Sequence, residues 1–91
     1  MSLNDVRNRL DRTGFSFLLN DTELALTLAR IAQDSECDSE KQLRNRNNAR
    51  RAYDTITGLM SRVALTSEEE QELTTKLEQL KSELQLLGEQ F

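Results

Sequence analysis

The strongest structural signal in this chain of 91 residues lies in residues 66–88, which read TSEEEQELTTKLEQLKSELQLLG. Leucines recur there at spacings of four, three, four and three residues, which is a heptad seam made of Leu73, Leu77, Leu80, Leu84 and Leu87. Thr66 and Glu69 form the first of two overlapping capping boxes, and Gly88 is typical of a residue that ends a helix. The stretch therefore predicts a helix over residues 67–87 that buries a leucine face.

The same kind of periodicity predicts two further helices upstream. Apolar residues at helical spacing cover about residues 21–34, after cap-forming side chains at residues 20–23, and the alanines among them leave room for a close neighbouring helix. A second run over residues 40–63 follows Ser39, which is positioned to form a capping box with Gln42. Because both connecting loops are short, we expect the three helices to be antiparallel neighbours.

The N-terminal residues carry a weaker pattern. Val6 and Leu10 form one apolar pair at helical spacing, which is too little to anchor an isolated short helix in water. Residues 1–14 are therefore predicted to be a flexible or short-helical arm that ends at Gly14, and residues 15–91 a single helical domain. Together these patterns predict an all-α protein, an antiparallel three-helix bundle with a loose N-terminal arm.

Composition excludes several classes of function. The chain has no histidine, so it lacks both the commonest general acid or base and the commonest metal ligand. Its single cysteine, Cys37, rules out a disulfide framework and every multi-cysteine metal site, and acidic neighbours disfavour its thiolate. We therefore expect no enzyme activity, no catalytic residue, no cofactor and no metal.

Charge and hydropathy bear on location. No apolar run approaches the roughly 20 residues that span a bilayer, and no hydrophobic stretch of a secretory signal follows the first charged residues. The net charge of −4 also disfavours an anionic membrane surface. The sequence therefore favours a cytoplasmic protein, in which Cys37 stays reduced.

A dense apolar cluster precedes the first predicted helix. It has no obvious place in a minimal bundle, so its side chains are candidate contacts for a protein partner: Phe15, Phe17, Leu18 and Leu19. The partner itself is unknown, and self-association is an alternative.

A second candidate surface lies in residues 41–51, which hold five basic residues and no acidic one. The candidate anion contacts are Arg44, Arg46, Arg50 and Arg51. Binding of nucleic acid is the less favoured interpretation, because the whole chain is acidic and the run contains no aromatic side chain on which bases could stack. An exposed helix face that complements the acidic third helix is preferred. Tyr53 is expected to be a core aromatic residue.

The leucine seam also has two interpretations. It can close a three-helix bundle within one chain, or it can pair with a second copy in a homodimeric coiled coil. The apolar stripes of the first two helices need a cover, so closure within the chain is preferred.

Two segments at the centre of the chain carry a family resemblance. Residues 24–32 and 48–56 together resemble the paired helices of a tetratricopeptide repeat. With the third helix, the order of helices is similar to that of a microtubule-interacting and transport domain. The run at 48–55, Asn-Ala-Arg-Arg-Ala-Tyr-Asp-Thr, is similar to one in a group of short uncharacterised bacterial proteins. The resemblance implies a small helical bundle that binds partner helices in its grooves.

The function expected from the sequence is that of a non-enzymatic protein–protein interaction module of uncharacterised role, which docks partner helices or peptides. One alternative is a small nucleic-acid-associated regulator that uses residues 41–51. The other is a structural homodimer that associates through the leucine seam.

Overall fold

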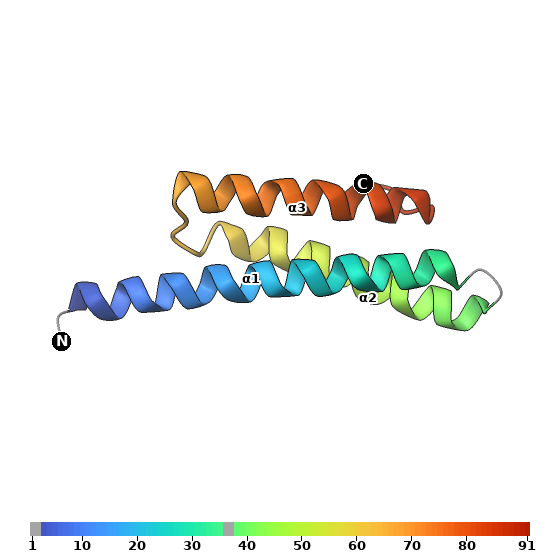
Figure 1. Cartoon of the computed structure of the whole chain (residues 1–91), viewed down its shortest axis with the longest axis horizontal. Coiled ribbons are helices and arrows are strands. Elements are labelled where there is room, and N and C mark those ends of the chain that lie inside the picture. Colours follow the sequence, from blue (N-terminus) through green and yellow to red (C-terminus); the bar gives the residue numbers. More distant parts are fainter. Residues whose placement is uncertain (1–2, 36–37) are drawn as a thin grey trace.

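The computed structural model of the chain is a bundle of three antiparallel helices, which confirms the predicted all-α fold (Figure 1). The helices are α1 (Leu3–Asp34), α2 (Ser39–Met60) and α3 (Ser67–Leu86). The structure describes residues 3–35 and 38–91, with side chains from Gly14 onward; Cys37 and the side chains of Val6 and Leu10 lie outside that description.

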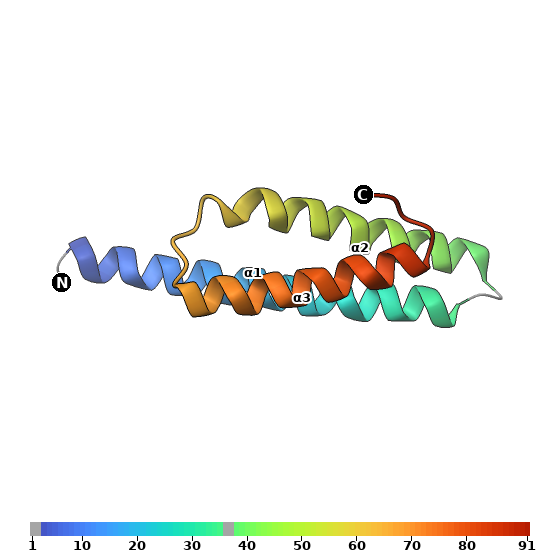
Figure 2. The same ribbon diagram turned by 90° about the horizontal axis from the view of Figure 1, so that it is seen from above.

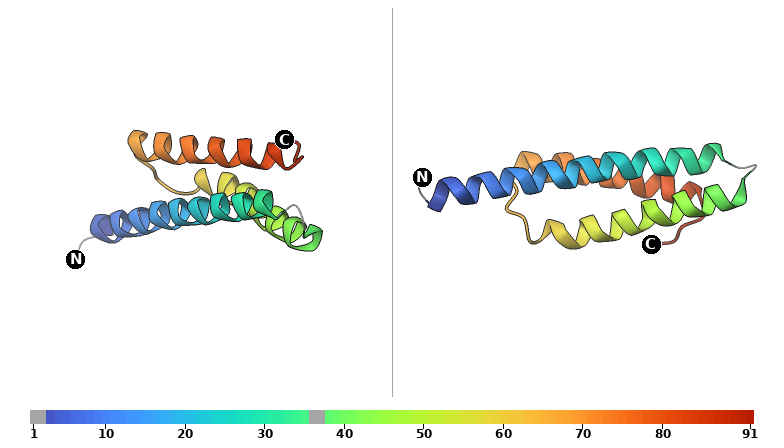
Figure 3. Two further views of the ribbon diagram at one scale, coloured as in Figure 1. Left: turned by 45° about the vertical axis from the view of Figure 1, so that its right-hand side comes forward. Right: turned by 90° about the horizontal axis from the view of Figure 1, so that it is seen from below.

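The bundle is elongated because α1 is much longer than its two neighbours. Its 32 residues correspond to about 48 Å of helix, whereas α2 has 22 residues and α3 has 20. The molecule measures 55 × 20 × 16 Å. Figure 2 shows that the first part of α1 extends beyond the start of α3. α1 packs against both other helices, while α2 and α3 touch each other sparingly along their length (Figure 3).

The prediction that the first helix begins near residue 21 is wrong. α1 is continuous from Leu3, so residues 3–14 extend the helix. The residues that resemble a cap lie inside it: the Thr22 hydroxyl donates to the Leu18 carbonyl oxygen at 2.7 Å, one turn back in the same helix. A hydroxyl that bonds backward in this way is compatible with a helix interior, so it does not mark a helix start.

A close contact with another part of the chain explains why a glycine, Gly14, occupies a position inside α1. A Cβ atom added there would lie 3.0 Å from Cγ1 of Val63, in the loop between α2 and α3. The missing side chain lets this loop approach the helix. Gly14 therefore does not mark the end of a separate arm, as predicted, but is a point of close packing inside α1.

α2 differs from its prediction at both ends. Its N-cap is Asp38, whose carboxylate accepts from the backbone N–H of Lys41, so the predicted cap at Ser39 is wrong by one residue. Gln42 does not close a capping box, since its side chain donates to the Ala32 carbonyl oxygen of α1. The helix ends at Met60 instead of residue 63, because the next backbone N–H bonds tighten to a three-residue spacing.

α3 matches its prediction closely. The side chain of Thr66 accepts from the backbone N–H of Glu69, and the Glu69 side chain accepts from that of Thr66, which is the predicted capping box. Four residues of the leucine seam are buried, so the seam closes the bundle within one chain; they are Leu73, Leu77, Leu80 and Leu84. They pack in one core with apolar residues of the other helices, namely Leu18, Ala25, Leu26, Ala29, Ala49 and Ile56.

Gly58 offers a test of the helix assignment at α2. It lies in the helix interior at an exposed position, and a Cβ atom added there meets nothing within 4 Å. Gly58→Ala is therefore expected to raise the free energy of unfolding by about 0.5–1 kcal/mol, because alanine loses less backbone entropy in a helix. Thermal unfolding should show a rise in Tm of a few degrees. A fall in Tm would contradict the helical assignment at this position.

Candidate functional site

The apolar cluster predicted as a partner-binding surface is divided by the structure between core and surface. Leu18 is fully buried in the core, and Phe15 and Leu19 are half-buried. Phe17 alone of the four points to solvent, with 55% of its surface exposed. The cluster is therefore mostly the beginning of the bundle core, because α1 extends through it.

Phe17 belongs to a second apolar row on α1, beside the buried one. Leu24 lies seven residues further along, on the same side of the helix, and is 58% exposed. Leu28 and Ile31 continue the row and are half-buried. Two turns of helix thus present large exposed apolar side chains next to the core-facing row. We call Phe17, Leu24, Leu28 and Ile31 the α1 face.

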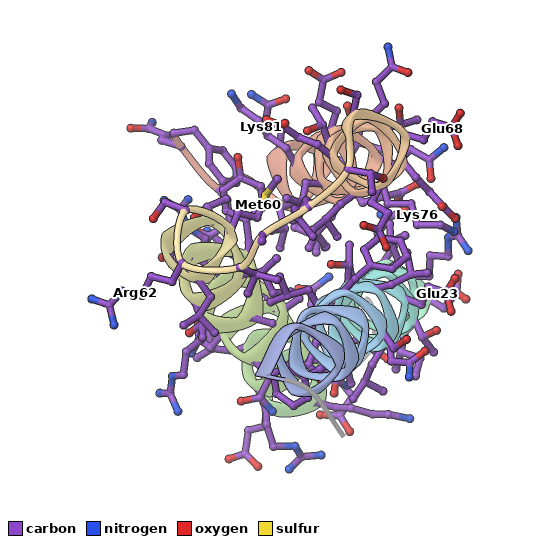
Figure 4. The ribbon with its side chains drawn as sticks, turned by 90° about the vertical axis from the view of Figure 1, so that its left-hand side faces the viewer. Glu23, Met60, Arg62, Glu68, Lys76 and Lys81 are labelled. Atoms are coloured by element: carbon purple, nitrogen blue, oxygen red, sulfur yellow. The ribbon has the colours of Figure 1, made fainter. Side chains whose placement is uncertain are left out.

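Acidic side chains dominate the charge around the α1 face. Among the side chains of α1 that the structure describes, which run from Gly14 to Asp34, three are acidic, namely Asp21, Glu23 and Asp34, and one is basic, Arg30. Glu23 also forms an ion pair with Lys76 of α3, with 3.1 Å between Oε1 and Nζ (Figure 4). The α1 face is thus an apolar row in a mildly acidic setting.

The basic run of residues 41–51 is not one surface. Because successive helical residues are about 100° apart around the axis, Arg44 and Arg46 project in nearly opposite directions. Arg44 and Arg51 line a shallow hollow of about 380 Å³ on the outer side of α2. Arg46 and Arg50 instead meet the last residues of the chain. The four predicted anion contacts therefore form two separate pairs.

The segment after α3, residues 89–91, turns back and lies against α2 (Figure 2). We call it the tail. Nη2 of Arg46 lies 2.8 Å from Oε2 of Glu89 in an ion pair. Nη1 of Arg50 donates to the Gln90 carbonyl oxygen at 2.7 Å. The tail thus supplies a carboxylate partner for Arg46 and a carbonyl partner for Arg50. The sequence had instead favoured pairing of these arginines with the acidic face of α3.

Aromatic and cationic contacts hold the last side chain of the tail. The guanidinium carbon of Arg50 lies 3.9 Å from the centroid of the Phe91 ring, and Nζ of Lys81 lies 5.3 Å from it. The ring of Tyr53 meets Phe91 edge-on, with 4.9 Å between centroids and 74° between planes. Tyr53 is half-buried: it packs against the core and also contacts the tail. We call Arg46, Arg50, Tyr53 and Lys81 the tail seat.

A Schellman motif directs the chain from α3 into the tail. Gly88 has a φ of +93°, its N–H donates to the Gln85 carbonyl oxygen, and the N–H of Glu89 donates to that of Leu84. This confirms Gly88 as the helix stop. The cap uses the backbone N–H of Glu89, so it fixes the backbone as far as that residue and does not involve the Glu89 side chain, Gln90 or Phe91.

The tail is held only weakly. The ion pair and the cation–π contact are partly exposed and stabilise by about 0.5–1 kcal/mol each, with a similar contribution from the aromatic pair and the hydrogen bond. Ordering three residues costs about 1–2 kcal/mol per residue. These opposing contributions nearly cancel, so seated and released tails are close in free energy.

A second hollow lies at the opposite end of α2. It has a volume of about 350 Å³ and is lined by Thr57, Met60, Ser61, Val63, Leu65 and Glu70. Figure 4 shows Met60 between α2 and α3 at this end and Arg62 directed to solvent. Several of its apolar side chains also pack against the core, so the hollow is an edge of the bundle and offers no group with reactive chemistry.

Comparison of the chain with known protein families, curated proteins and solved structures gives no match. The resemblance to tetratricopeptide-repeat and microtubule-interacting bundles stays a prediction. Among the described side chains, no group of three or more Cys, Asp or Glu residues is arranged to hold a metal ion. Within the described parts of the three helices, none is both long and apolar enough to cross a membrane.

Sequence reasoning missed the tail seat. It identified Arg46 and Arg50 as candidate contacts but assigned no role to Glu89 or Phe91. The available signal was an acidic residue and an aromatic residue shortly after the helix-ending Gly88, in a chain whose residues 41–51 hold five basic residues and no acidic one.

Proposed function

We propose that the protein is a non-enzymatic protein–protein interaction module that docks a helix of a partner protein on the α1 face. The observation that carries this proposal is the pair of large exposed apolar residues, Phe17 and Leu24, aligned on a long helix beside the core. An amphipathic helix covers such a row with side chains spaced three, four and seven residues apart.

The charge around the α1 face supports a particular kind of partner helix. Over the part of α1 that bears the α1 face, from Gly14 to Asp34, Asp21, Glu23 and Asp34 outnumber Arg30. A partner helix that carries basic residues beside its apolar row is complementary to this setting, and such complementarity favours fast and specific association. The proposed partner is therefore a basic amphipathic helix.

The two alternatives have less support. A homodimer through the leucine seam would have to expose the side chains that α3 buries, since four of the five seam leucines lie in the core of one chain. A nucleic-acid surface along residues 41–51 would need its arginines on one side of α2, but they form two separate pairs. Neither alternative is supported by a pair of large exposed apolar side chains such as Phe17 and Leu24 of the α1 face.

The proposal predicts that Phe17→Ser with Leu24→Ser abolishes partner capture. Loss of two apolar contacts should weaken binding by at least about tenfold, because burying one such side chain stabilises by about 1.5–3 kcal/mol. The measurement is quantitative affinity purification from the native cells, followed by cross-linking that maps the contact to a partner segment. That segment should be a basic amphipathic helix.

Leu43→Ser is the matched control, because Leu43 is 55% exposed on the outer side of α2. This variant should retain the partner that the double variant loses, and all variants should keep their helical circular-dichroism spectra. Recovery of the same partner by the double variant, or cross-links to a segment that is not helical, would refute docking on the α1 face.

A further inference from the structure

The tail seat carries a second inference, which concerns a different surface and does not depend on docking at the α1 face. We propose that the tail seat is a binding site for a short acidic–aromatic peptide segment of a partner protein, and that the tail occupies it within the chain as a displaceable substitute. The chemistry of the accepted segment can be derived from the contacts of the tail.

Each contact of the tail selects a type of group. Arg46 pairs with a carboxylate, that of Glu89, and Arg50 donates to a backbone carbonyl, that of Gln90. The ring of Phe91 lies against the Arg50 guanidinium and the edge of Tyr53. No contact described for the tail uses the Gln90 side chain. The seat therefore fits an acidic residue, then any residue, then an aromatic residue.

The Glu89 side chain, Gln90 and Phe91 can leave the seat without disturbing the bundle. The Schellman cap of α3 uses only the backbone N–H of Glu89, and none of the three tail residues belongs to the hydrophobic core. Phe91 remains 46% exposed even when seated. Gly88, with its φ of +93°, allows the chain to turn at the junction. An occupant held so lightly can be exchanged for a segment that binds more tightly.

Contacts other than those with the tail hold two side chains of the seat, Arg50 and Tyr53, in place. Arg46, Arg50 and Tyr53 stand on one side of a regular helix, and Tyr53 also packs against the core. Nε of Arg50 lies 3.2 Å from both carboxylate oxygens of Asp54, which orients the guanidinium independently of the tail. A preorganised seat loses little entropy when a peptide binds.

A peptide suits the seat better than a nucleic acid. Asp54 places a carboxylate against Arg50, where it would repel a phosphate group. Arg44 and Arg51 lie on the other side of α2, so only part of the basic run could contact one strand. The space between the Arg50 guanidinium and the Tyr53 ring also accepts an aromatic side chain, which in this structure is that of Phe91.

The test uses the full chain with Glu89→Ala and Phe91→Ala, which empties the seat. The probe is an isotope-free synthetic peptide of residues 85–91, titrated into the ¹⁵N-labelled protein and followed by NMR. We expect a Kd on the order of 0.1–1 mM, the range set by the effective concentration of a short tether. The natural chain, whose tail competes, should bind the same peptide about twofold more weakly, because seated and released tails are close in free energy.

Matched variants locate the site. In the emptied chain, Arg50→Ala should reduce peptide affinity at least tenfold, whereas Arg51→Ala, one residue away on the outer side of α2, should leave it unchanged. A peptide with its phenylalanine replaced by alanine should not bind. Unchanged Tm values show that every variant remains folded.

Four results would overturn the inference. One is that the peptide fails to bind the folded, emptied chain, and another is that Arg50→Ala and Arg51→Ala weaken it equally. A third is preferential binding of a single-stranded oligouridylate to the emptied seat. The last is a natural chain that sediments as a dimer only while Glu89 and Phe91 are intact, because the tail would then belong to a second copy.

Discussion

Leu80→Ala is expected to lower the free energy of unfolding by about 2–5 kcal/mol, a large part of the roughly 5–14 kcal/mol available to a domain of this size. Leu80 is fully buried at the centre of the α3 seam, with Leu77 and Leu84 buried on either side. Removing its side chain loses the transfer free energy and leaves a cavity that the flanking helices can fill only in part. Urea unfolding followed by circular dichroism should show a lower midpoint with an unchanged m-value.

Leu86→Ala is the control for this prediction. It makes the same chemical change in the same helix, but Leu86 is 76% exposed. Its effect should stay within about 0.5 kcal/mol. Equal losses at Leu80 and Leu86 would contradict the assignment of the seam to the core.

The same experiment separates the two interpretations of the seam. If it closes the bundle within one chain, the unfolding midpoint of both proteins should be independent of protein concentration. A homodimer held together by the seam would become more stable as the concentration rises. A concentration-dependent midpoint for the natural chain that disappears in Leu80→Ala would favour the homodimer.

The sequence was most informative where its signals were local. Thr66, Glu69 and Gly88 each act within a few residues, and the structure has the capping box and the helix stop that they predict. The leucine spacing in α3 likewise reports which side of that helix is apolar. The leucine seam of α3 needs an apolar surface to pack against, and the apolar sides of α1 and α2 together provide that surface.

The start of α1 was missed because its decisive contact is distant in sequence. Side chains such as Thr22 suit a helix start and also tolerate a helix interior, so local chemistry does not choose between them. Gly14 contacts Val63, 49 residues later, and a glycine that relieves crowding cannot be told from one that ends a helix until that neighbour is known.

The tail seat shows the same limit for function. The charge run at residues 41–51 included Arg46 and Arg50, whose partners in the structure are Glu89 and the Gln90 carbonyl. The identity of those partners depended on the turn at Gly88, which sends Glu89 and Phe91 to α2 and not onward from α3. The order of charges along the sequence also does not show that Arg44 and Arg51 lie on a different side of α2 from Arg46 and Arg50.

Ala29→Leu is expected to destabilise the bundle by about 1–3 kcal/mol even though it adds apolar surface. Ala29 is fully buried, as are Ala25 and Ala32 on α1 and Ala49 on α2. These small side chains set how closely the helices approach, as the sequence had indicated. An isobutyl group in their midst must push neighbouring helices apart or adopt a strained rotamer, since the interior is already close-packed.

Thr27→Leu provides the comparison, because Thr27 is exposed on α1 two residues from Ala29. It adds a side chain of the same kind without crowding the core, and leucine has the better helix propensity. Thermal unfolding should therefore show a lower Tm for Ala29→Leu than for the natural chain, and an unchanged or higher Tm for Thr27→Leu. If Ala29→Leu were as stable as the natural chain, the alanine row would be a tolerated gap and not the surface on which the helices meet.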